Sequence, residues 1–432
     1  MNDTLPTRVA TAEAVARSLR RRYAAERRFR LYGMGAIGVA LAMLLILFGT
    51  IFGNGWSAFR QTDLLLPVTL DAAEIDPQGA RDPAVLAAAD YEGQVKAALR
   101  AMFPEATGRK DKKALAELVS NGAGYALRDA VIADPSLLDR SFEIRVPASD
   151  LVDMVMKGRI PTDVPEADRP VSDSQLGWIA VLRDQDRLSL GFNTQFFVGG
   201  DSREPELAGI AGALLGSLWT MLVVLFLAFP MGVMAAIYLE EFASRNRWTD
   251  IIEVNINNLA AVPSIVFGLL GLAVFLNFFG MPRSAPLVGG MVLALMTLPT
   301  VIIASRAALK AVPPSIREAA LGLGASRMQM VSGHVLPLAM PGVLTGAIIG
   351  MARALGETAP LLMIGMVAFI VDLPKGPLHA ATVLPVQIFL WADSPERAFV
   401  ERTSAATIVL LVFLVLMNLG AVLLRRRFER RW

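Results

Sequence analysis

Apolar stretches long enough to cross a lipid bilayer are the feature that most constrains this fold. A membrane core of about 30 Å needs a helix of about 20 apolar residues, and several blocks of that length interrupt the sequence. They raise the hydrophobic share of the 432 residues to 54%, above the level of about 45–50% in soluble domains. The mean hydropathy is +0.50. We therefore expect an integral membrane protein.

The composition also excludes several kinds of chemistry. The chain has no cysteine, which rules out disulfides, thiol catalysis and cysteine-based metal sites. Its two histidines, His334 and His379, are too far apart in sequence to have a ligand-like spacing. The net charge of +2 is too small to indicate nucleic-acid binding. We expect no metal and no cofactor on this chain.

Basic residues crowd at the two ends of the chain and indicate its orientation. Positively charged segments next to spans stay in the cytoplasm, so we expect cytoplasmic tails at 1–30 and 425–432. The segment 31–53 reads as a retained anchor helix, and five further spans follow within 207–424. An even total of six spans places both tails on one side, as the charge rule requires. The spans are predicted at Leu31–Phe52, Leu207–Tyr238, Leu259–Phe279, Leu287–Ser305, Val335–Val371 (long enough to be broken or tilted) and Ala405–Leu424.

Residues 54–206 form a polar insertion between the first and second spans. It carries 17 basic and 25 acidic residues, so it lacks the lysine and arginine excess of a cytoplasmic loop. We expect a small extracytoplasmic α+β domain, whose acidic residues form a solvated surface. No catalytic constellation is evident in it. The pattern predicts helices at Ala89–Phe103 and Lys112–Asp134, a strand and a helix in Ser141–Gly158, and two strands in Gln175–Asn193 with a turn at Arg183–Asp186.

The loop 306–334, between the fourth and fifth spans, has an unusual pattern of small residues. Two prolines, suited to a first helical turn, precede Glu318-Ala319-Ala320, and Gly324 follows three residues later. On pattern alone this is also compatible with an ordinary connection. The sequence resembles the EAA loop of ABC-importer permeases, E-A-A-x3-G-x9-I-x-L-P, ending here in Leu336-Pro337. His334 stands where the family usually has isoleucine.

This resemblance implies a fold and a partner. The fold would be the all-α, six-helix type I ABC importer permease, with the α+β insertion added to it. The loop would dock on a separate ATP-binding subunit. The chain lacks the G-x-x-x-x-G-K-[ST] phosphate loop, so we expect no enzyme activity of its own, with ATP and Mg²⁺ bound by that subunit. The predicted docking residues are Arg317, Glu318, Ala319, Ala320, Gly324, Leu336 and Pro337.

A pair of charges interrupts the fifth predicted span. Arg353 and Glu357 are four residues apart, so they share one face of a helix. A charge at the centre of a span costs about 2.5–3.5 kcal/mol, so both should face protein or water. Gly356 and Pro360 permit a local break in the helix. The pair is either a structural salt bridge or an anion site in which Arg353 binds the substrate.

Two further polar residues are weaker candidates for the substrate path. Thr358 could donate a hydrogen bond to an oxyanion if it shares a cavity with Arg353. Arg306 closes the fourth span, either as a second anion contact or as an ordinary inside-facing charge.

The segment Ala352–Pro360, ARALGETAP, is similar to the motif of phosphate-specific permease subunits of ABC importers, of the PstA type. The resemblance implies phosphate import across the inner membrane by alternating access, with Arg353 and Glu357 on the path. It also implies three kinds of partner: a homologous PstC-type permease, two copies of a PstB-type ATPase and an extracytoplasmic PstS-type phosphate-binding protein.

Three other functions are compatible with parts of the sequence. A permease for molybdate or sulfate would keep the EAA loop without requiring the R-A-L-G-E-T-A-P core. An ion-coupled secondary transporter would need no docking loop and would be expected to contain inverted repeats, which are not evident here. A membrane-anchored sensor would work through residues 54–206 and would tolerate the loss of Arg353.

Overall fold

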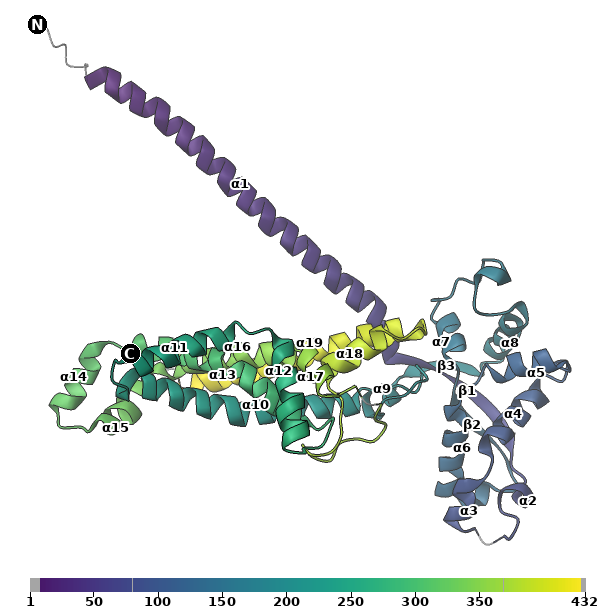
Figure 1. Ribbon diagram of the computed structural model, residues 1–432. Coiled ribbons are helices and arrows are strands. Elements are labelled where there is room, and N and C mark those ends of the chain that lie inside the picture. The colour runs from purple at the N-terminus through teal and green to yellow at the C-terminus, as the bar shows by residue number, and fades with distance from the viewer. Residues whose placement is uncertain (1–7, 80, 368, 429–432) are drawn as a thin grey trace, which may run out of the picture. The chain divides into compact units, whose positions relative to one another are not determined.

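The computed structural model describes residues 8–79, 81–367 and 369–428 (Figure 1). Contacts divide the chain into two compact units, residues 1–53 and 54–432. The first unit consists of helix α1 (Arg8–Gly55), and the apolar window of this span has a mean hydropathy of 2.4 with none of it buried. The outermost parts of the predicted basic tails, 1–7 and 429–432, lie outside the described residues.

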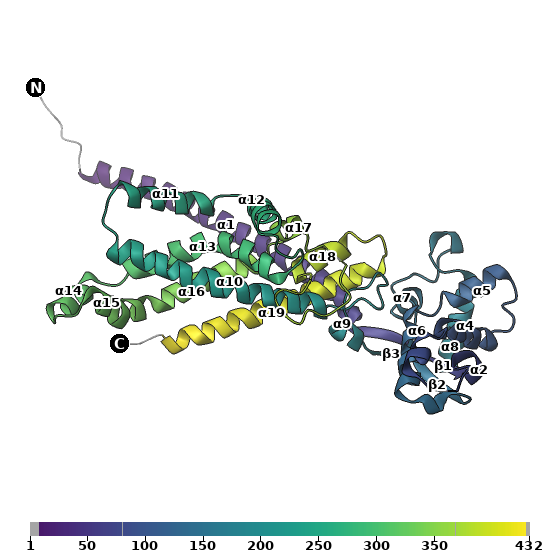
Figure 2. The ribbon, with the colours of Figure 1, turned by 60° about the horizontal axis from the view of Figure 1, so that its bottom comes forward.

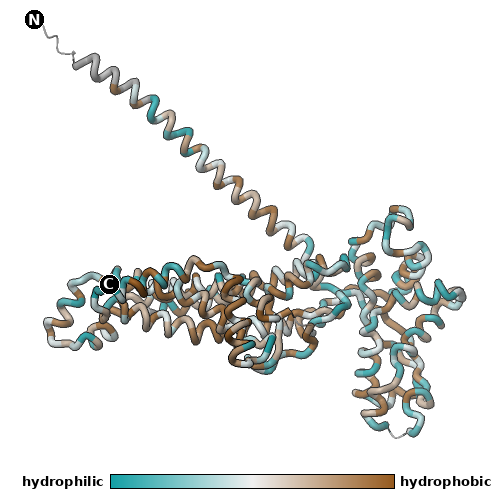
Figure 3. The backbone as a smooth tube through the Cα atoms, in the orientation of Figure 1, coloured by the Kyte–Doolittle hydropathy of each residue, from teal (hydrophilic) through white to brown (hydrophobic). Residues whose placement is uncertain are grey.

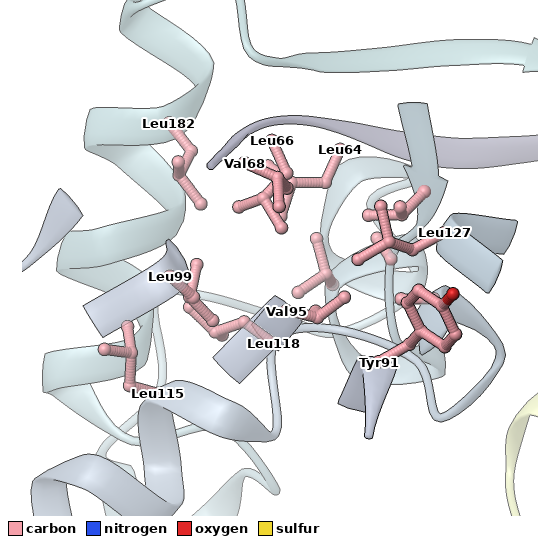
Figure 4. Packing of buried hydrophobic residues seen from close by; sticks show 14 of the residues in the cluster. Leu64, Leu66, Val68, Tyr91, Val95, Leu99, Leu115, Leu118, Leu127 and Leu182 are labelled. Carbon is pink, nitrogen blue, oxygen red and sulfur yellow. The ribbon is translucent and has the colours of Figure 1, made fainter. Parts of the chain in front are cut away.

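The insertion domain (residues 54–206) is built on a three-stranded antiparallel sheet of order β2-β1-β3. Alternate residues of the central strand, Leu64, Leu66 and Val68, are buried, because successive side chains of a strand point to opposite faces. They meet the buried leucines of the surrounding helices in one core (Figure 4). The strands are β1 (Arg60–Thr69), β2 (Ser141–Pro147) and β3 (Leu188–Phe192).

Short polar side chains start several helices of this domain. The carboxylate of Asp90 accepts a hydrogen bond from the Gly93 amide, and Ser172 forms a capping box with Gln175. The helices are α2 (Ala72–Ile75), α3 (Pro83–Ala88), α4 (Tyr91–Met102), α5 (Arg109–Ala116), α6 (Gly122–Ala133), α7 (Asp150–Met156), α8 (Asp173–Asp184) and α9 (Thr194–Val198), with 3-10 turns η1 (Trp56–Phe59), η2 (Pro135–Leu137) and η3 (Glu166–Asp168).

One sequence-based expectation for this domain was wrong. The predicted strand pair in 175–193 is α8 followed by β3, because Trp178, Ile179 and Leu182 are buried with a helical spacing. The helical pattern over 112–134 corresponds to two helices, α5 and α6, with a turn between them, in which Val119 pairs with Ala148. The predicted strand and helix in 141–158 are confirmed by β2 and α7.

The remaining helices form a helical core (residues 207–428), in which apolar residues dominate (Figure 3). It contains α10 (Ala211–Ile237), η4 (Tyr238–Phe242), α11 (Arg247–Ala260), α12 (Ser264–Leu270), η5 (Gly271–Phe278), α13 (Pro286–Lys310), α14 (Pro314–Gly322), α15 (Arg327–Met330), η6 (Val331–Val335), α16 (Leu336–Leu355), α17 (Ala359–Met363), α18 (Leu384–Ala392) and α19 (Ala398–Phe428); here η4, η5 and η6 are π-helical.

Within the described residues five helices are long and apolar enough to be spans, or up to six if one bent pair counts as a span. In that pair, α11 meets α12 and η5 at an angle of 103°. Pro263 stands at the bend, where its missing N–H and its ring disfavour a continuous helix. The third predicted span is thus shorter than a full crossing, and the count of six remains a prediction.

The fifth predicted span is broken, as expected. Helix α16 ends at Leu355, three residues intervene, and α17 begins at Ala359. The connection predicted after it, 372–403, contains an additional helix, α18, whose residues Leu384 and Gln387 are buried. That segment is therefore part of the packed core rather than only a surface loop.

Glycines allow α13 and α16 to approach closely. A Cβ atom built on Gly342 would lie 2.7 Å from the Ala308 Cβ, and one on Gly346 would lie 2.2 Å from the Ala304 Cβ. Helices in membranes associate through such small residues because their backbones can then pack tightly. This contact fixes α16, and with it Arg353, against α13.

Candidate functional site

The break between α16 and α17 brings together three of the predicted path residues. Arg353 lies in the last turn of α16, and its Nε lies 3.6 Å from Glu357 Oε1. Thr358 is the residue that starts α17. The Glu357 amide donates to the Ala354 carbonyl, which folds the chain back over the end of α16. The helix end thus holds Arg353 and Glu357 in contact, with Thr358 next to Glu357 in the chain.

The guanidinium group of Arg353 has donors to spare. Its side chain is 51% exposed, whereas that of Glu357 is 20% exposed. The ion pair with Glu357 engages Nε, and within the described part of the chain no other hydrogen bond of this guanidinium is recorded. Arginine presents five N–H donors in a planar fork that can bind two oxygens of an oxyanion. The site can therefore accept an anion with Glu357 as a competing partner.

Arg306 lies elsewhere. Gly350, one turn before Arg353, packs on Thr297 of α13, and Arg306 is nine residues further along that helix. This corresponds to about 14 Å of helix rise. The structure does not bring Arg306 to Arg353, and its role as an anion contact stays a prediction.

Carboxylates from two other elements already hold Arg306. Its Nη2 lies 2.6 Å from Glu253 Oε1 of α11, and its Nε lies 3.3 Å from Glu240 Oε2 of η4. Lys310 adds a second cation near Glu240, at 3.6 Å. These ion pairs join α11, η4 and α13 at one end of the helical core.

The EAA motif forms a helix–turn–helix at that same end (Figure 2). Gly324 has φ +85°, a left-handed conformation that glycine adopts without strain. This lets the amide of Ala325 donate to the Ala320 carbonyl at 3.1 Å, which closes the end of α14. The motif glycine is therefore explained by backbone geometry.

The loop 306–334, which is predicted to couple to an ATPase and is called the coupling loop below, has a buried side and an exposed side. Ala320 is 6% exposed and packs with Val312 and Val335 in a core cluster. On the other side Leu323 is 91% exposed and Met328 is 64% exposed. The exposed side is the one available to a partner protein. The predicted docking residues divide accordingly: Glu318, Ala319 and Gly324 are exposed, while Arg317, Leu336 and Pro337 are half-buried.

Arg317 braces the loop from within the chain. Its guanidinium makes a bidentate contact with Glu241, at 2.7 Å for the shortest N–O pair. It also donates to the carbonyls of Leu309 and Val312 at the end of α13. Arg317 thus connects α14 to the end of α13 and to η4.

A buried ion triad attaches the insertion domain to α19. Lys157 Nζ lies 2.6 Å from Asp153 Oδ2 and 2.7 Å from Glu401 Oε1, and none of the three side chains is more than 11% exposed. Asp153 Oδ1 also accepts hydrogen bonds from the amide and the hydroxyl of Thr62. Arg402, also buried, donates to the Ala58 carbonyl. Buried charges need such partners, so this attachment is specific.

A second attachment joins the end of the insertion to α18. Oδ1 of Asp201 accepts hydrogen bonds from Gln387 Nε2 at 2.9 Å and Trp391 Nε1 at 3.1 Å. Burial raises the pKa of Asp201. The insertion domain is therefore held to the helical core at both of its ends.

Asp201 also lines a cavity of about 670 Å³. Its walls include the carboxylates of Asp63, Asp129 and Asp201 and the ring of Tyr125, and burial raises the pKa of Asp63 as well. The acidic side chains in this lining make the cavity a less suitable site for a phosphate anion than the helix break at Arg353. Among the described residues no group of histidines and carboxylates has an arrangement that would hold a metal ion.

Glu206, next to this cavity, gives the protein a pH-dependent stability. Burial raises its pKa from 4.5 to about 7, opposed by a hydrogen bond from Ser120 and assisted by the charges of Asp150 and Glu204. The folded state therefore binds a proton more tightly than the unfolded state. Stability is greatest below the unfolded pKa and falls as pH rises through the folded pKa, by about 3 kcal/mol in total for a shift of this size.

We expect Glu206→Gln to remove this loss of folding stability at high pH. Thermal unfolding of the purified protein should show a higher melting temperature for the variant at pH 8 and an equal one near pH 5. The matched change Glu105→Gln, at an exposed position, should leave the pH dependence unchanged. A variant whose melting temperature follows that of the original chain at both pH values would contradict the assignment.

The sequence did not reveal the partners of the charged residues. The glycine contacts between α13 and α16 were also missed. Glu241 and Glu401 are 76 and 244 residues away from the cations that they bind, and no local pattern announces such pairs. The spacing of Gly342, Gly346 and Gly350 could have been read directly, since small residues four apart share a helix face.

Comparison with known proteins adds three findings. Residues 228–432 match the family described as "Binding-protein-dependent transport system inner membrane component", and residues 16–166 match a domain of unknown function, DUF3333. The phosphate transport system permease protein PstA 1 of Mycobacterium tuberculosis (strain CDC 1551 / Oshkosh) is 32% identical over 255 residues, 59% of this chain and 81% of the relative. PstA of Yersinia pestis is 34% identical over 252 residues, 56% of this chain and 81% of the relative.

Solved structures of ABC transporters are more distant. A chain of the MetNI methionine ABC transporter in inward facing conformations is 17% identical, with a TM-score of 0.42 over 51% of this chain and 95% of that chain.

Proposed function

The chain belongs to the family of binding-protein-dependent transport system inner membrane components, among permeases of the PstA type, and on that premise we propose that it conducts phosphate. It is a multi-pass protein of the inner membrane. The observation that carries the proposal is the Arg353–Glu357 pair at a helix break, with guanidinium donors left over. Phosphate transport, the function in the relatives' names, matches the oxyanion chemistry of that pair.

In the proposed mechanism, the anion exchanges places with Glu357 on Arg353. A delivered phosphate accepts hydrogen bonds from the guanidinium fork, and Thr358 donates another from its hydroxyl. When the spans rock to the opposite access state, the Glu357 carboxylate competes for Arg353 again and releases the anion. The chain's contribution is therefore a fixed cation whose partner alternates between a carboxylate and the cargo.

The coupling loop supplies the force in this proposal. A cytoplasmic ATPase binds the exposed side around Leu323, and its closure pushes α14. The ion pair between Arg317 and Glu241 passes that displacement to α13 and η4. Arg353 lies about 24 Å further along α16 from Leu336-Pro337, beyond direct reach of the ATPase.

The remaining assignments follow from the same proposal. The tails at 1–30 and 425–432 lie in the cytoplasm, and residues 54–206 lie on the opposite side. The other subunits are a PstC-type permease, two PstB-type ATPases that bind ATP and Mg²⁺, and a PstS-type binding protein. Transport systems of this family depend on a binding protein, as the family description states.

Uptake by cells tests the proposed cargo. In cells that lack phosphate import of their own, the complete importer should accumulate radiolabelled phosphate, and excess sulfate or molybdate should not compete. The control omits only this chain. Equal uptake of labelled sulfate or molybdate would assign the permease to another oxyanion, and uptake in the control would remove this chain from the path.

A further inference from the structure

A row of aromatic rings lies where the insertion domain joins the helical core. Trp56 meets Phe59 edge to face at 5.8 Å between ring centroids, and Phe59 stacks on Phe197 at 5.7 Å. Phe197 in turn stacks on Phe192 at 5.6 Å. These rings come from η1, the end of β3 and α9, so three segments of the insertion converge here.

The inner side of this row is packed on the ends of the spans. Phe59 and the fully buried Phe196 belong to a cluster that includes Ile210 before α10, Trp391 of α18 and Ala405 of α19. Residues at those positions lie where the apolar parts of α10 and α19 begin. The depth of the ring row is therefore fixed at the boundary of the membrane-spanning region.

The outer side of the row is uncovered. Trp56 is 66% exposed, Phe192 67%, Phe197 40% and the neighbouring Val198 63%. These four residues form the interfacial patch. Leaving several large apolar side chains together in water is unfavourable, and such a patch marks a binding surface for protein or membrane.

We propose that the interfacial patch lies in the headgroup layer of the lipid bilayer and seats the insertion domain on the membrane. The first candidate spanning helix runs from Arg21 to Phe59, so Trp56 lies in its last turn. Tryptophan there places its apolar ring at headgroup level. Arg60 is exposed beside the patch, and Arg159 donates to Ser57 Oγ at 2.8 Å. Aromatic and arginine side chains together are the anchors that fix spans at the interface.

The membrane accounts for the patch better than a protein partner does. The row continues from the packed ends of α10 and α19, with Phe192 at the border between the row and the cavity lined by Asp63, Asp129 and Asp201. The buried triad at Lys157 holds the domain to α19, and the interfacial patch would oppose its tilting on the membrane side. The inference does not depend on which anion is transported.

Spin labels can measure this placement, because the chain contains no cysteine to remove. Single variants Val198→Cys and Phe192→Cys would be labelled in the complete importer in lipid nanodiscs. The control is Ile132→Cys, 39% exposed on α6. Ile132 lies ten residues after Gly122, the first residue of α6. It is therefore about 15 Å along the helix from that end. The relaxation of each spin label is then measured with oxygen, which partitions into lipid, and separately with a water-soluble nickel complex.

Both patch sites should show an oxygen-to-nickel accessibility ratio severalfold higher than the Ile132 site. Ratios equal to that of Ile132 would place the patch in water and overturn the proposal. Protection from both reagents would place the patch against protein and overturn it equally. The change at Val198 removes only an exposed side chain, so this site remains readable if Phe192→Cys disturbs the ring row.

Discussion

Replacing Arg353 by glutamine should lower phosphate uptake by about 100-fold at equal levels of the protein in the membrane. The neutral amide loses about two charge-assisted hydrogen bonds to the anion, about 3 kcal/mol together. Arg353→Lys should be intermediate, because it keeps the charge but not the planar fork. Glu357→Gln should lower the maximal rate together with KM, since the anion is then held without a competitor. Initial rates of labelled phosphate uptake measure all three.

The matched control for this series is Arg283→Gln. Arg283 is exposed in the connection between η5 and α13, and the change removes the same charge away from the helix break. It should leave uptake unchanged. Normal uptake by both Arg353→Gln and Glu357→Gln would remove the pair from the anion path and leave it as a structural salt bridge.

The sequence predicted the candidate site best where the functional residues are close together in the chain. Arg353, Glu357 and Thr358 lie within six residues, so the sequence alone places them together once the helix break is recognised. The pair Pro313-Pro314 likewise indicated the start of the short helix that the structure shows as α14. The role of Arg306 could not be predicted in this way, because its carboxylate partners come from η4 and α11.

The fold was predictable to a similar extent. Apolar length predicted the membrane class and the main spans, and the family match and the helices confirm the helical permease core with its α+β insertion. The central strand β1 was missed because its apolar run around Leu64-Leu65-Leu66 fits either a strand or a helix. It becomes a strand through pairing with β2, more than 70 residues later. Non-local pairing of this kind leaves no periodic signal in a single sequence.

Leu323→Asp should release the ATPase subunit from the importer. Leu323 is 91% exposed in the turn between α14 and α15, so the substitution leaves the packing of this chain intact. Burying a leucine against a partner contributes about 1.5–3 kcal/mol, and its loss weakens the complex by about 10- to 100-fold. A carboxylate in the apolar contact adds a desolvation cost. The measurement is the amount of ATPase that copurifies with this chain.

Uptake should fall with the lost subunit, because the spans then receive no force. The matched control Leu190→Asp places the same change on β3 of the insertion domain, at a side chain that is 39% exposed, and should leave copurification unchanged. Undiminished recovery of the ATPase with Leu323→Asp would show that the subunit binds elsewhere. In that case Arg317 and Glu241 would brace a connecting loop rather than transmit motion. A loss of copurifying ATPase with Leu323→Asp alone would instead show that the exposed side of the coupling loop binds this subunit, through contacts distinct from those at Arg353.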